Sequence, residues 1–125
     1  MSPAELWFPD KHGESKVAVA ATDEVVYGPV QGGRIHRIHN IAVENEDNSA
    51  TDIRLLVTGG GAEILLKEFN TVTAAVLMVF GGDIELTEGE KLIARFTGVT
   101  IGDNLKMYCV GSYLDTASGG SLYPF

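Results

Sequence analysis

Hydrophobic and polar residues alternate along several short stretches of this chain. The clearest stretch is Gly81–Phe96, in which apolar residues recur at every second position on both sides of Glu88-Gly89-Glu90. These apolar residues are Ile84, Leu86, Leu92, Ala94 and Phe96. Such alternation is typical of a strand with one face in a core and the other in water. Because a short connection containing glycine favours a turn, the sequence predicts a β-hairpin here.

Two further strands are predicted on either side of a polar loop, Asn45–Ala50. In Arg34–Glu44 the apolar residues change from one parity to the other, and a β-bulge within His36–His39 would bring them onto one face. In Asp52–Thr58 the alternation is uninterrupted. Since the loop consists of turn-forming residues, we expect the two strands to form an antiparallel pair.

Three other segments have weaker patterns. Lys16–Ala21 and Glu24–Val30 are short β-rich runs, and Pro29 restricts the second to an edge of a sheet because proline donates no backbone hydrogen bond. Ala62–Phe69 is too short for its period to separate a strand from a single helical turn. Both alternatives remain open for that segment.

Asn70–Phe80 is rich in β-branched residues and ends at a pair of glycines. It carries apolar residues on both parities, with Leu77 and Val79 on the face opposite to Met78. We therefore expect a strand that is covered on both sides, either by the N-terminal segment or by another subunit.

Together with a last strand at Leu105–Leu114, these segments amount to about eight short strands at intervals of roughly ten residues. The sequence thus predicts an all-β fold, a single-domain antiparallel β-sandwich that is jelly-roll-like. We expect the sandwich to span residues 16–115, after an extended N-terminal arm at 1–15 and before a C-terminal tail at 116–125. Because the arm carries Trp7 and Phe8, we expect it to dock on its own domain or on a neighbour.

Composition and charge narrow the function classes. A chain of 125 residues is sufficient for one domain with a single core. The formal net charge of −8 disfavours nucleic acid as a partner, because phosphate binding requires a basic surface. The single cysteine, Cys109, excludes an intramolecular disulfide and lies in an apolar run, which favours a buried side chain over a nucleophile. Neither a signal peptide nor a membrane-spanning run is visible, so we expect a soluble protein.

Candidate metal ligands are few. His36 and His39 are three residues apart on a predicted strand, so they point to opposite faces unless a bulge intervenes. We therefore interpret them as structural or solvent-facing histidines. The acidic residues Glu44, Glu46 and Asp47 lack the spaced ligand series and the central glycine of a calcium loop, which favours a solvated turn.

Signatures of catalysis are also lacking. The glycines at 59–61 and 119–120 are not followed by the Lys-Ser/Thr of a phosphate-binding loop. Ser112, Ser118 and Ser121 have no histidine near them in sequence, and this gives no reason to propose a catalytic triad. A cupin-type enzyme would need further histidines on adjacent strands. We predict that the protein is not an enzyme, with no catalytic residue, no cofactor and no metal.

From about Arg34 to Asp115 the chain resembles small structural β-proteins of tailed bacteriophages, in particular the jelly-roll or sandwich subunits that decorate capsids or build tails. The resemblance rests on a long strand leading into Val43-Glu44-Asn45, a strand of the type Ile53-x-Leu55-x-Val57, the pattern Leu86-x-x-Gly89-x-x-Leu92-x-Ala94, and a last strand ending near Ser112-Tyr113.

This resemblance implies a virion protein, made in the host cytoplasm, that acts by binding. A capsid decoration (cement) protein would form a homo-oligomer, with a trimer favoured, and would bind other virion proteins such as the major capsid protein. Neither nucleic acid nor a membrane would be a partner. The residues expected at such interfaces are Leu6, Trp7, Phe8, Leu77, Val79, Tyr123 and Phe125. A tail or neck component and a receptor- or carbohydrate-binding module are the alternatives.

Overall fold

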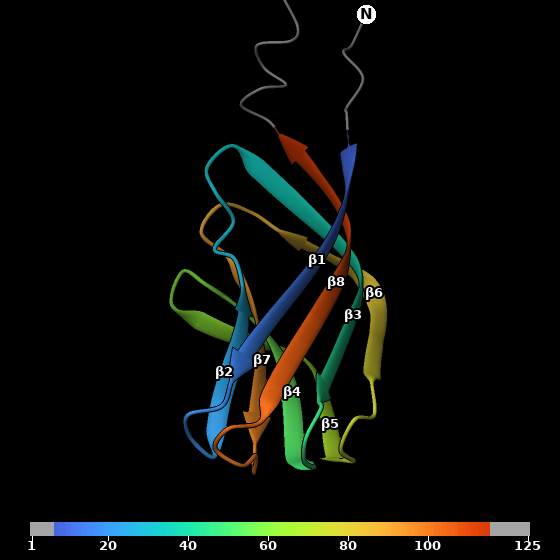
Figure 1. The fold of residues 1–125 in the computed structure, drawn as a ribbon. Coiled ribbons are helices and arrows are strands. Elements are labelled where there is room, and N and C mark those ends of the chain that lie inside the picture. The colour runs from blue at the N-terminus through green and yellow to red at the C-terminus, as the bar shows by residue number, and fades with distance from the viewer. Residues whose placement is uncertain (1–6, 116–125) are drawn as a thin grey trace, which may run out of the picture.

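The computed structural model describes residues 7–115 as two packed antiparallel sheets of four strands each (Figure 1). The strands are β1 (Trp7–Val17), β2 (Thr22–Tyr27), β3 (Arg34–Asn45), β4 (Ala50–Gly59), β5 (Ala62–Val72), β6 (Met78–Leu86), β7 (Lys91–Thr97) and β8 (Asn104–Asp115). The predicted all-β sandwich is confirmed. Within this range the structure has no helix long and apolar enough to cross a membrane.

The order of the strands defines the topology. Sheet A has the order β1-β8-β3-β6 and sheet B the order β2-β7-β4-β5. The first strand pairs with the last, the second with the seventh, the third with the sixth and the fourth with the fifth, as if one long hairpin had been wrapped around the core. Two further pairs, β3 with β8 and β4 with β7, join these hairpin-like pairs into the two sheets. This is the strand order of a jelly roll.

The hairpin predicted at Gly81–Phe96 is wrong, because its two strands lie in opposite sheets. β6 pairs with β3 in sheet A, whereas β7 pairs with β2 and β4 in sheet B. The antiparallel pair predicted between Arg34–Glu44 and Asp52–Thr58 is wrong in the same way, since β3 and β4 are also in different sheets. Alternation identified the buried face of these four strands correctly, but it carries no information about which strand lies alongside.

The strand predicted at Asn70–Phe80 is also wrong, because the chain turns within it. β5 ends at Val72 and β6 begins at Met78. Between them Ala75 has a left-handed φ of 58°, and its N–H donates to the Asn45 carbonyl at 2.8 Å. The open alternative at Ala62–Phe69 is resolved as a strand, since this segment lies in β5. β4 and β5 form a true hairpin, whose turn uses the positive φ of Gly60 and Gly61.

The predicted bulge in Arg34–Glu44 is confirmed. The register of β3 with both neighbouring strands shifts between Ile38 and Asn40. The shift brings Ile38, Ile41 and Val43 into the core together. Gly111 of β8 lies opposite Ile38, and a Cβ at this position would lie only 2.0 Å from the carbonyl oxygen of Arg37. The bulge therefore requires a glycine beside it.

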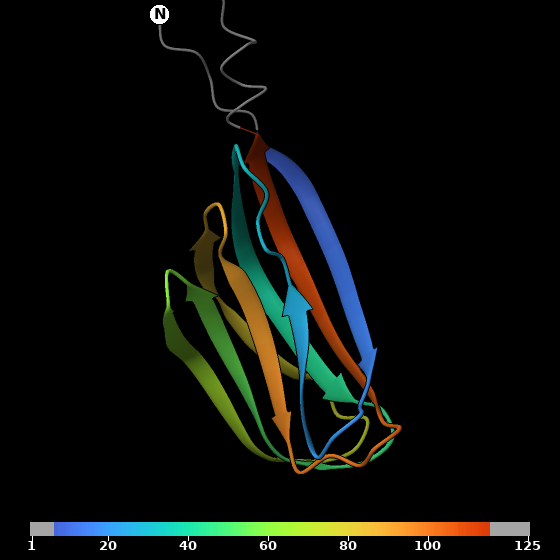
Figure 2. The same ribbon diagram turned by 90° about the vertical axis from the view of Figure 1, so that its left-hand side faces the viewer.

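Residues 7–15 of the predicted N-terminal arm lie in β1. This strand pairs with β8 along its whole length, from Trp7 opposite Leu114 to Val17 opposite Asn104. The sandwich therefore begins at residue 7 and not at residue 16. Residues 1–6 and 116–125, with the predicted interface residues Leu6, Tyr123 and Phe125, lie outside the described residues. Figure 2 shows β1 and β2 at neighbouring edges of the two sheets.

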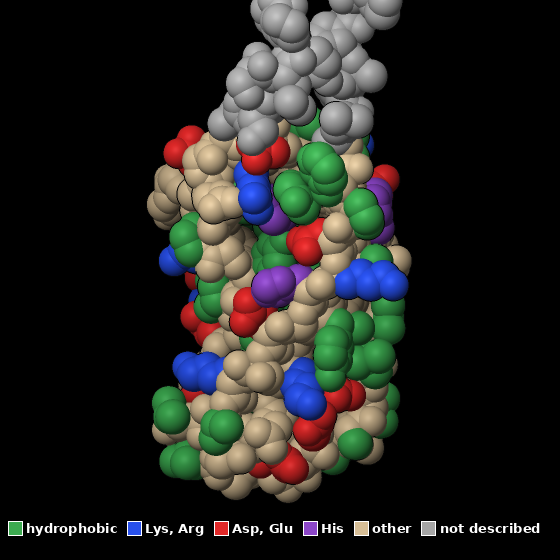
Figure 3. Space-filling view, turned by 45° about the horizontal axis from the view of Figure 1, so that its top comes forward, with side chains coloured by type: hydrophobic (Ala, Val, Ile, Leu, Met, Phe, Trp, Pro, Cys, Tyr) green, Lys and Arg blue, Asp and Glu red, His purple; other side chains and the backbone are tan. Residues whose placement is uncertain are grey.

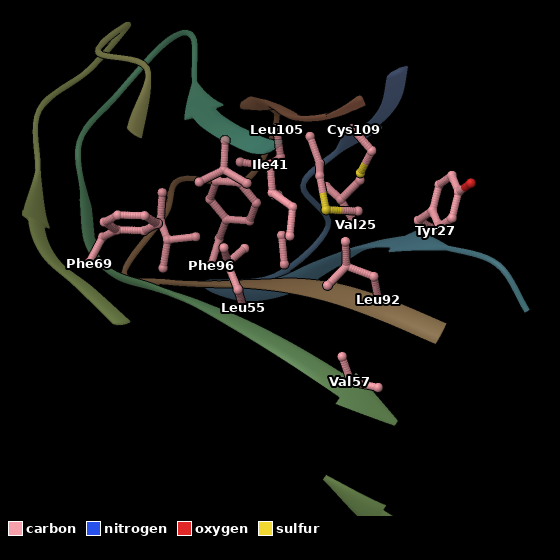
Figure 4. Packing of buried hydrophobic residues seen from close by; sticks show 14 of the residues in the cluster. Val25, Tyr27, Ile41, Leu55, Val57, Phe69, Leu92, Phe96, Leu105 and Cys109 are labelled. Atoms are coloured by element: carbon pink, nitrogen blue, oxygen red, sulfur yellow. The ribbon is translucent and has the colours of Figure 1, made fainter. Parts of the chain in front are cut away.

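The core lies between the two sheets and is almost entirely apolar (Figure 4). Leu55, Leu92 and Phe96 of sheet B face Ile41 and Leu105 of sheet A, and all five are at most 1% exposed. Cys109 is buried at the margin of this cluster, as its apolar run indicated. Burial raises the pKa of its thiol to about 12, so Cys109 is not a thiolate at neutral pH.

Candidate functional site

The inner face of β1 is polar where the neighbouring strand is apolar. Asp10, His12 and Glu14 occupy alternate positions of β1 and are half-buried. In the register with β8, His12 lies opposite Cys109 and Glu14 opposite Met107, both of which belong to the core. The polar residues of β1 therefore line the place where the sandwich opens between β1 and β2.

A hydrogen-bonded chain runs across this opening. Tyr27 is 5% exposed, and its hydroxyl donates to Asp10 Oδ2 at 2.9 Å. The same hydroxyl lies 2.6 Å from Nδ1 of His36. A tyrosine hydroxyl has one proton, and Tyr27 uses it in the hydrogen bond to Asp10. Nδ1 of His36 must therefore carry a proton of its own and donate a hydrogen bond to the Tyr27 oxygen. In the neutral ring this leaves a free lone pair on Nε2 of His36.

Burial sets the protonation states of His36 and Tyr27. It lowers the pKa of His36, and the charges of Arg34 and His12 lower that pKa further, whereas Asp10 partly opposes the shift. His36 is therefore neutral at pH 7. Burial also raises the pKa of Tyr27, and the hydrogen bond to Asp10 raises it further. Tyr27 thus stays protonated and acts as a fixed donor, not as a base or nucleophile.

An aromatic row borders the same opening. Tyr113 of β8 lies between two direct partners in sheet A, Phe8 of β1 on one side and His36 of β3 on the other. The Tyr113 ring stacks on Phe8 at a centroid distance of 5.3 Å and on His36 at 5.7 Å. The Arg34 guanidinium carbon lies 4.6 Å from the centroid of the Tyr113 ring. These contacts hold a cation beside the carboxylates of β1.

Together these groups surround a hollow of about 340 Å³, which we call the edge hollow. Its lining includes the side chains of Asp10, His12, Glu14, Tyr27, Arg34, His36 and Tyr113. Figure 3 looks toward this end of the sandwich, where histidine, acidic and basic side chains gather around hydrophobic ones. The arrangement offers hydrogen-bond acceptors that the buried Tyr27 holds in place, and a cation, Arg34, that lies over the Tyr113 ring.

A second feature lies on the outer face of sheet A. Ala42 of β3 lies between two direct partners, Tyr108 of β8 and Val79 of β6. Val110 lies on the same face, two residues along β8 from Tyr108. Tyr108 is 37% exposed, Val110 42% and Val79 57%. Leu77, in the connection just before β6, is exposed as well. We call Ala42, Val79, Tyr108 and Val110 the apolar face.

The structure separates the predicted interface residues. Val79 is in the apolar face and Leu77 lies close to it in sequence, whereas Phe8 stacks beside the edge hollow. Trp7 lies under the guanidinium of Arg37, whose Cζ is 4.2 Å from the centroid of the tryptophan ring. The predicted set therefore does not form one continuous patch among the described residues.

The two histidines of the metal hypothesis point apart. His36 faces the edge hollow, whereas His39 lies on the outside, with Nδ1 2.7 Å from Asp83 Oδ1. Within residues 7–115 there is no group of three or more His, Cys, Asp or Glu side chains arranged to hold a metal ion. In the acidic loop, Asp47 accepts hydrogen bonds from Asn104, and Glu46 is paired with Lys106.

No hydropathy pattern in the sequence points to the edge hollow. Asp10, His12 and Glu14 alternate with Lys11, Gly13 and other residues that are also not apolar, so hydropathy shows no period in this segment. The spacing of three ionisable residues at every second position was the available signal. His12, which falls in the segment expected to be an arm, is in fact on a strand.

Comparison with known proteins adds no family to this description. The chain matches no protein-family model, and no curated protein matches it. The strand order therefore gives the class of the protein, an eight-stranded jelly-roll β-sandwich, and the function has to be argued from its surfaces.

Proposed function

We propose that the protein is a non-enzymatic structural subunit of a phage particle, a capsid decoration protein that binds its neighbours through the apolar face. The observation that carries the proposal is the exposure of Val79, Tyr108 and Val110 side by side on sheet A. Contiguous exposed apolar residues mark interaction surfaces. Jelly rolls occur in viral capsids, lectins and cupins, and the sequence resemblance favours the first of these.

The surroundings of the apolar face suit a protein interface. Lys11, Asn40, Glu44 and Lys106 lie beside it in the register of sheet A, so polar residues border its apolar centre. Burying one large apolar side chain contributes about 1.5–3 kcal/mol. A tyrosine at the centre adds a ring with a polar tip, the residue type that is enriched at binding hot spots.

The partners follow from this surface and from the charge. We infer that copies of the chain associate, with a trimer favoured, and that the oligomer binds the shell proteins of the head, so that the protein is located in the virion. The net charge of −8 favours a partner with a basic surface. A tail or neck component would use the same face, and antibody labelling of purified particles would separate that location from the head.

Light scattering on the full chain tests the proposal. The wild-type protein should be an oligomer, and Val79→Glu should weaken its association on the order of 100-fold, because a charge buried at an interface without a partner costs several kcal/mol. Ile101→Glu is the matched control, since Ile101 is also exposed but lies in the connection between β7 and β8. A wild-type monomer, or equal masses for the wild type and V79E, would overturn the proposal.

A further inference from the structure

We propose that the edge hollow binds a neutral saccharide. This inference goes beyond the proposed function, because it concerns the opening between β1 and β2 and not the outer face of sheet A. It rests on three observations: the polar inner face of β1, the hydrogen-bonding groups that remain available there, and the balance of charge around the hollow.

The first observation is that β1 departs from the pattern of the sandwich. An inner face built from Asp10, His12 and Glu14 contributes no apolar burial, although the residues opposite His12 and Glu14 are in the core. Polar groups in such a position reduce stability unless they are hydrogen-bonded, and here Asp10 pairs with Tyr27 and His12 pairs with Glu14. Departures of this kind are expected where a fold carries a function.

The second observation is that the hollow offers two hydrogen-bond acceptors, on Asp10 and His36, that take no hydrogen bond from the described residues. Asp10 uses Oδ2 for Tyr27, and its Oδ1 accepts no hydrogen bond from the residues that the structure describes. His36 donates through Nδ1, which leaves a lone pair on Nε2. Tyr27 holds both groups in fixed positions. Sugar hydroxyls are donors, and such a preorganised set of acceptors would orient them.

The third observation is the balance of charge. Asp10 and Glu14 are acidic, whereas Arg34 places a cation in the same lining. With two carboxylates and one guanidinium in the lining, an anionic ligand would meet like charge, whereas a neutral ligand with many hydroxyls would meet acceptors and a donor together. The volume of about 340 Å³ is at the lower end of the range for small-molecule sites and suits a monosaccharide or disaccharide.

Saturation-transfer NMR and calorimetry on the full chain test this proposal with four probes. These are the methyl glycosides of glucose, mannose, galactose and N-acetylglucosamine. At least one of them should bind the wild type, and Asp10→Asn should weaken that binding by about tenfold, the effect of about 1.4 kcal/mol. Asp83→Asn is the matched control, because Asp83 is an exposed carboxylate on the outside of β6. The D83N variant should bind the glycoside as the wild type does.

A second variant separates binding from folding. His12 lines the hollow and is half-exposed, with its ring edge-on to Tyr27, so His12→Ala should lower the melting temperature only slightly while it weakens the binding of the same glycoside. The proposal is overturned if no glycoside binds, if D10N and H12A both bind normally, or if butylammonium binds where the glycosides do not. Val79→Glu should bind the glycoside like the wild type, so a failure of the saccharide site is distinguishable from a failure of the proposed interface.

Discussion

Arg95 and Glu63 form an ion pair across the outer face of sheet B, with Nη2 of the arginine 2.6 Å from Oε2 of the glutamate. Arg95 is in β7 and Glu63 in β5, and β4 lies between them. Leu56 of β4 and Ile93 of β7 point outward in the one row between the two partners, yet they are only 5% and 7% exposed. The ion pair therefore covers apolar residues on an outer face.

This relationship predicts that Arg95→Ala destabilises the fold by about 1–2 kcal/mol, because the arginine stem shields apolar area as well as carrying charge. Urea denaturation measures the change. Arg54→Ala is the matched control, since Arg54 lies opposite Arg95 on the same face but is half-exposed and pairs with the adjacent Glu68. Its substitution should cost no more than about 0.5 kcal/mol. Equal losses for the two variants would contradict the covering role.

A second prediction concerns Gly111 and the bulge in β3. Gly111→Ala should destabilise by about 3 kcal/mol or more, because its Cβ would lie 2.0 Å from the Arg37 carbonyl oxygen and the backbone would have to move. Gly13→Ala is the control, since its Cβ would meet the Tyr108 ring at an ordinary 3.6 Å. We expect a change within about 0.5 kcal/mol there. Thermal unfolding of both variants checks the difference, and a G111A protein as stable as wild type would show that the bulge rearranges freely.

The features that the sequence predicted well are those with a local signal. The bulge was predictable because Ile38 and Ile41 are close in sequence and fall on opposite parities. Strand pairing was not, since β6 and β7 face one core from opposite sheets and alternate just as two strands of a hairpin would. In a jelly roll the partners of β1 and β2 come from the other end of the chain, and no local pattern specifies them.

The edge hollow depends on long-range contacts in the same way. Asp10, Tyr27 and His36 belong to three different strands and meet only when both sheets have formed. Each residue has an ordinary interpretation by itself, as a polar edge residue, a core tyrosine or a structural histidine. The exposed part of the apolar face was partly predictable, because Val79 lies on the outward parity of an apolar run, but its neighbours Tyr108 and Val110 come from β8.

The lowered pKa of His36 predicts how stability changes with pH. The folded-state pKa lies below the unfolded value of about 6.5, so the unfolded chain binds the proton more readily in this window. The free energy of unfolding should therefore fall as the pH is lowered through 6.5 toward the folded-state pKa. Asp10 partly opposes the shift, whereas Arg34 and His12 reinforce it. His36→Gln removes the titrating group, and denaturant titrations at pH 7.5 and 5.5 should show a smaller pH dependence than wild type. An unchanged pH dependence would refute the assignment.

The Asp103 carboxylate ties together the loops at the end of the sandwich that is remote from the edge hollow. It is buried, and it accepts hydrogen bonds from the side chains of Asn45 and Asn48 at 2.8 and 2.6 Å and from the backbone of Thr100 at 2.8 Å. Burial alone raises the pKa of Asp103, but these donors outweigh it and leave the pKa below its ordinary value.

Asp103→Ala should therefore cost about 2–4 kcal/mol, since Asn45 is fully buried and its donor would be left without a partner. The contribution of the wild-type Asp103 carboxylate to the free energy of unfolding should be complete above pH 3.8, the pKa of this group in the unfolded chain. It should be lost as the pH falls through the lower folded-state pKa. Asp83→Ala, at an exposed carboxylate, is the control and should stay within about 0.5 kcal/mol of wild type. Urea denaturation at pH 7 distinguishes the two, and a D103A variant as stable as D83A would show that Asp103 does not hold the loops together.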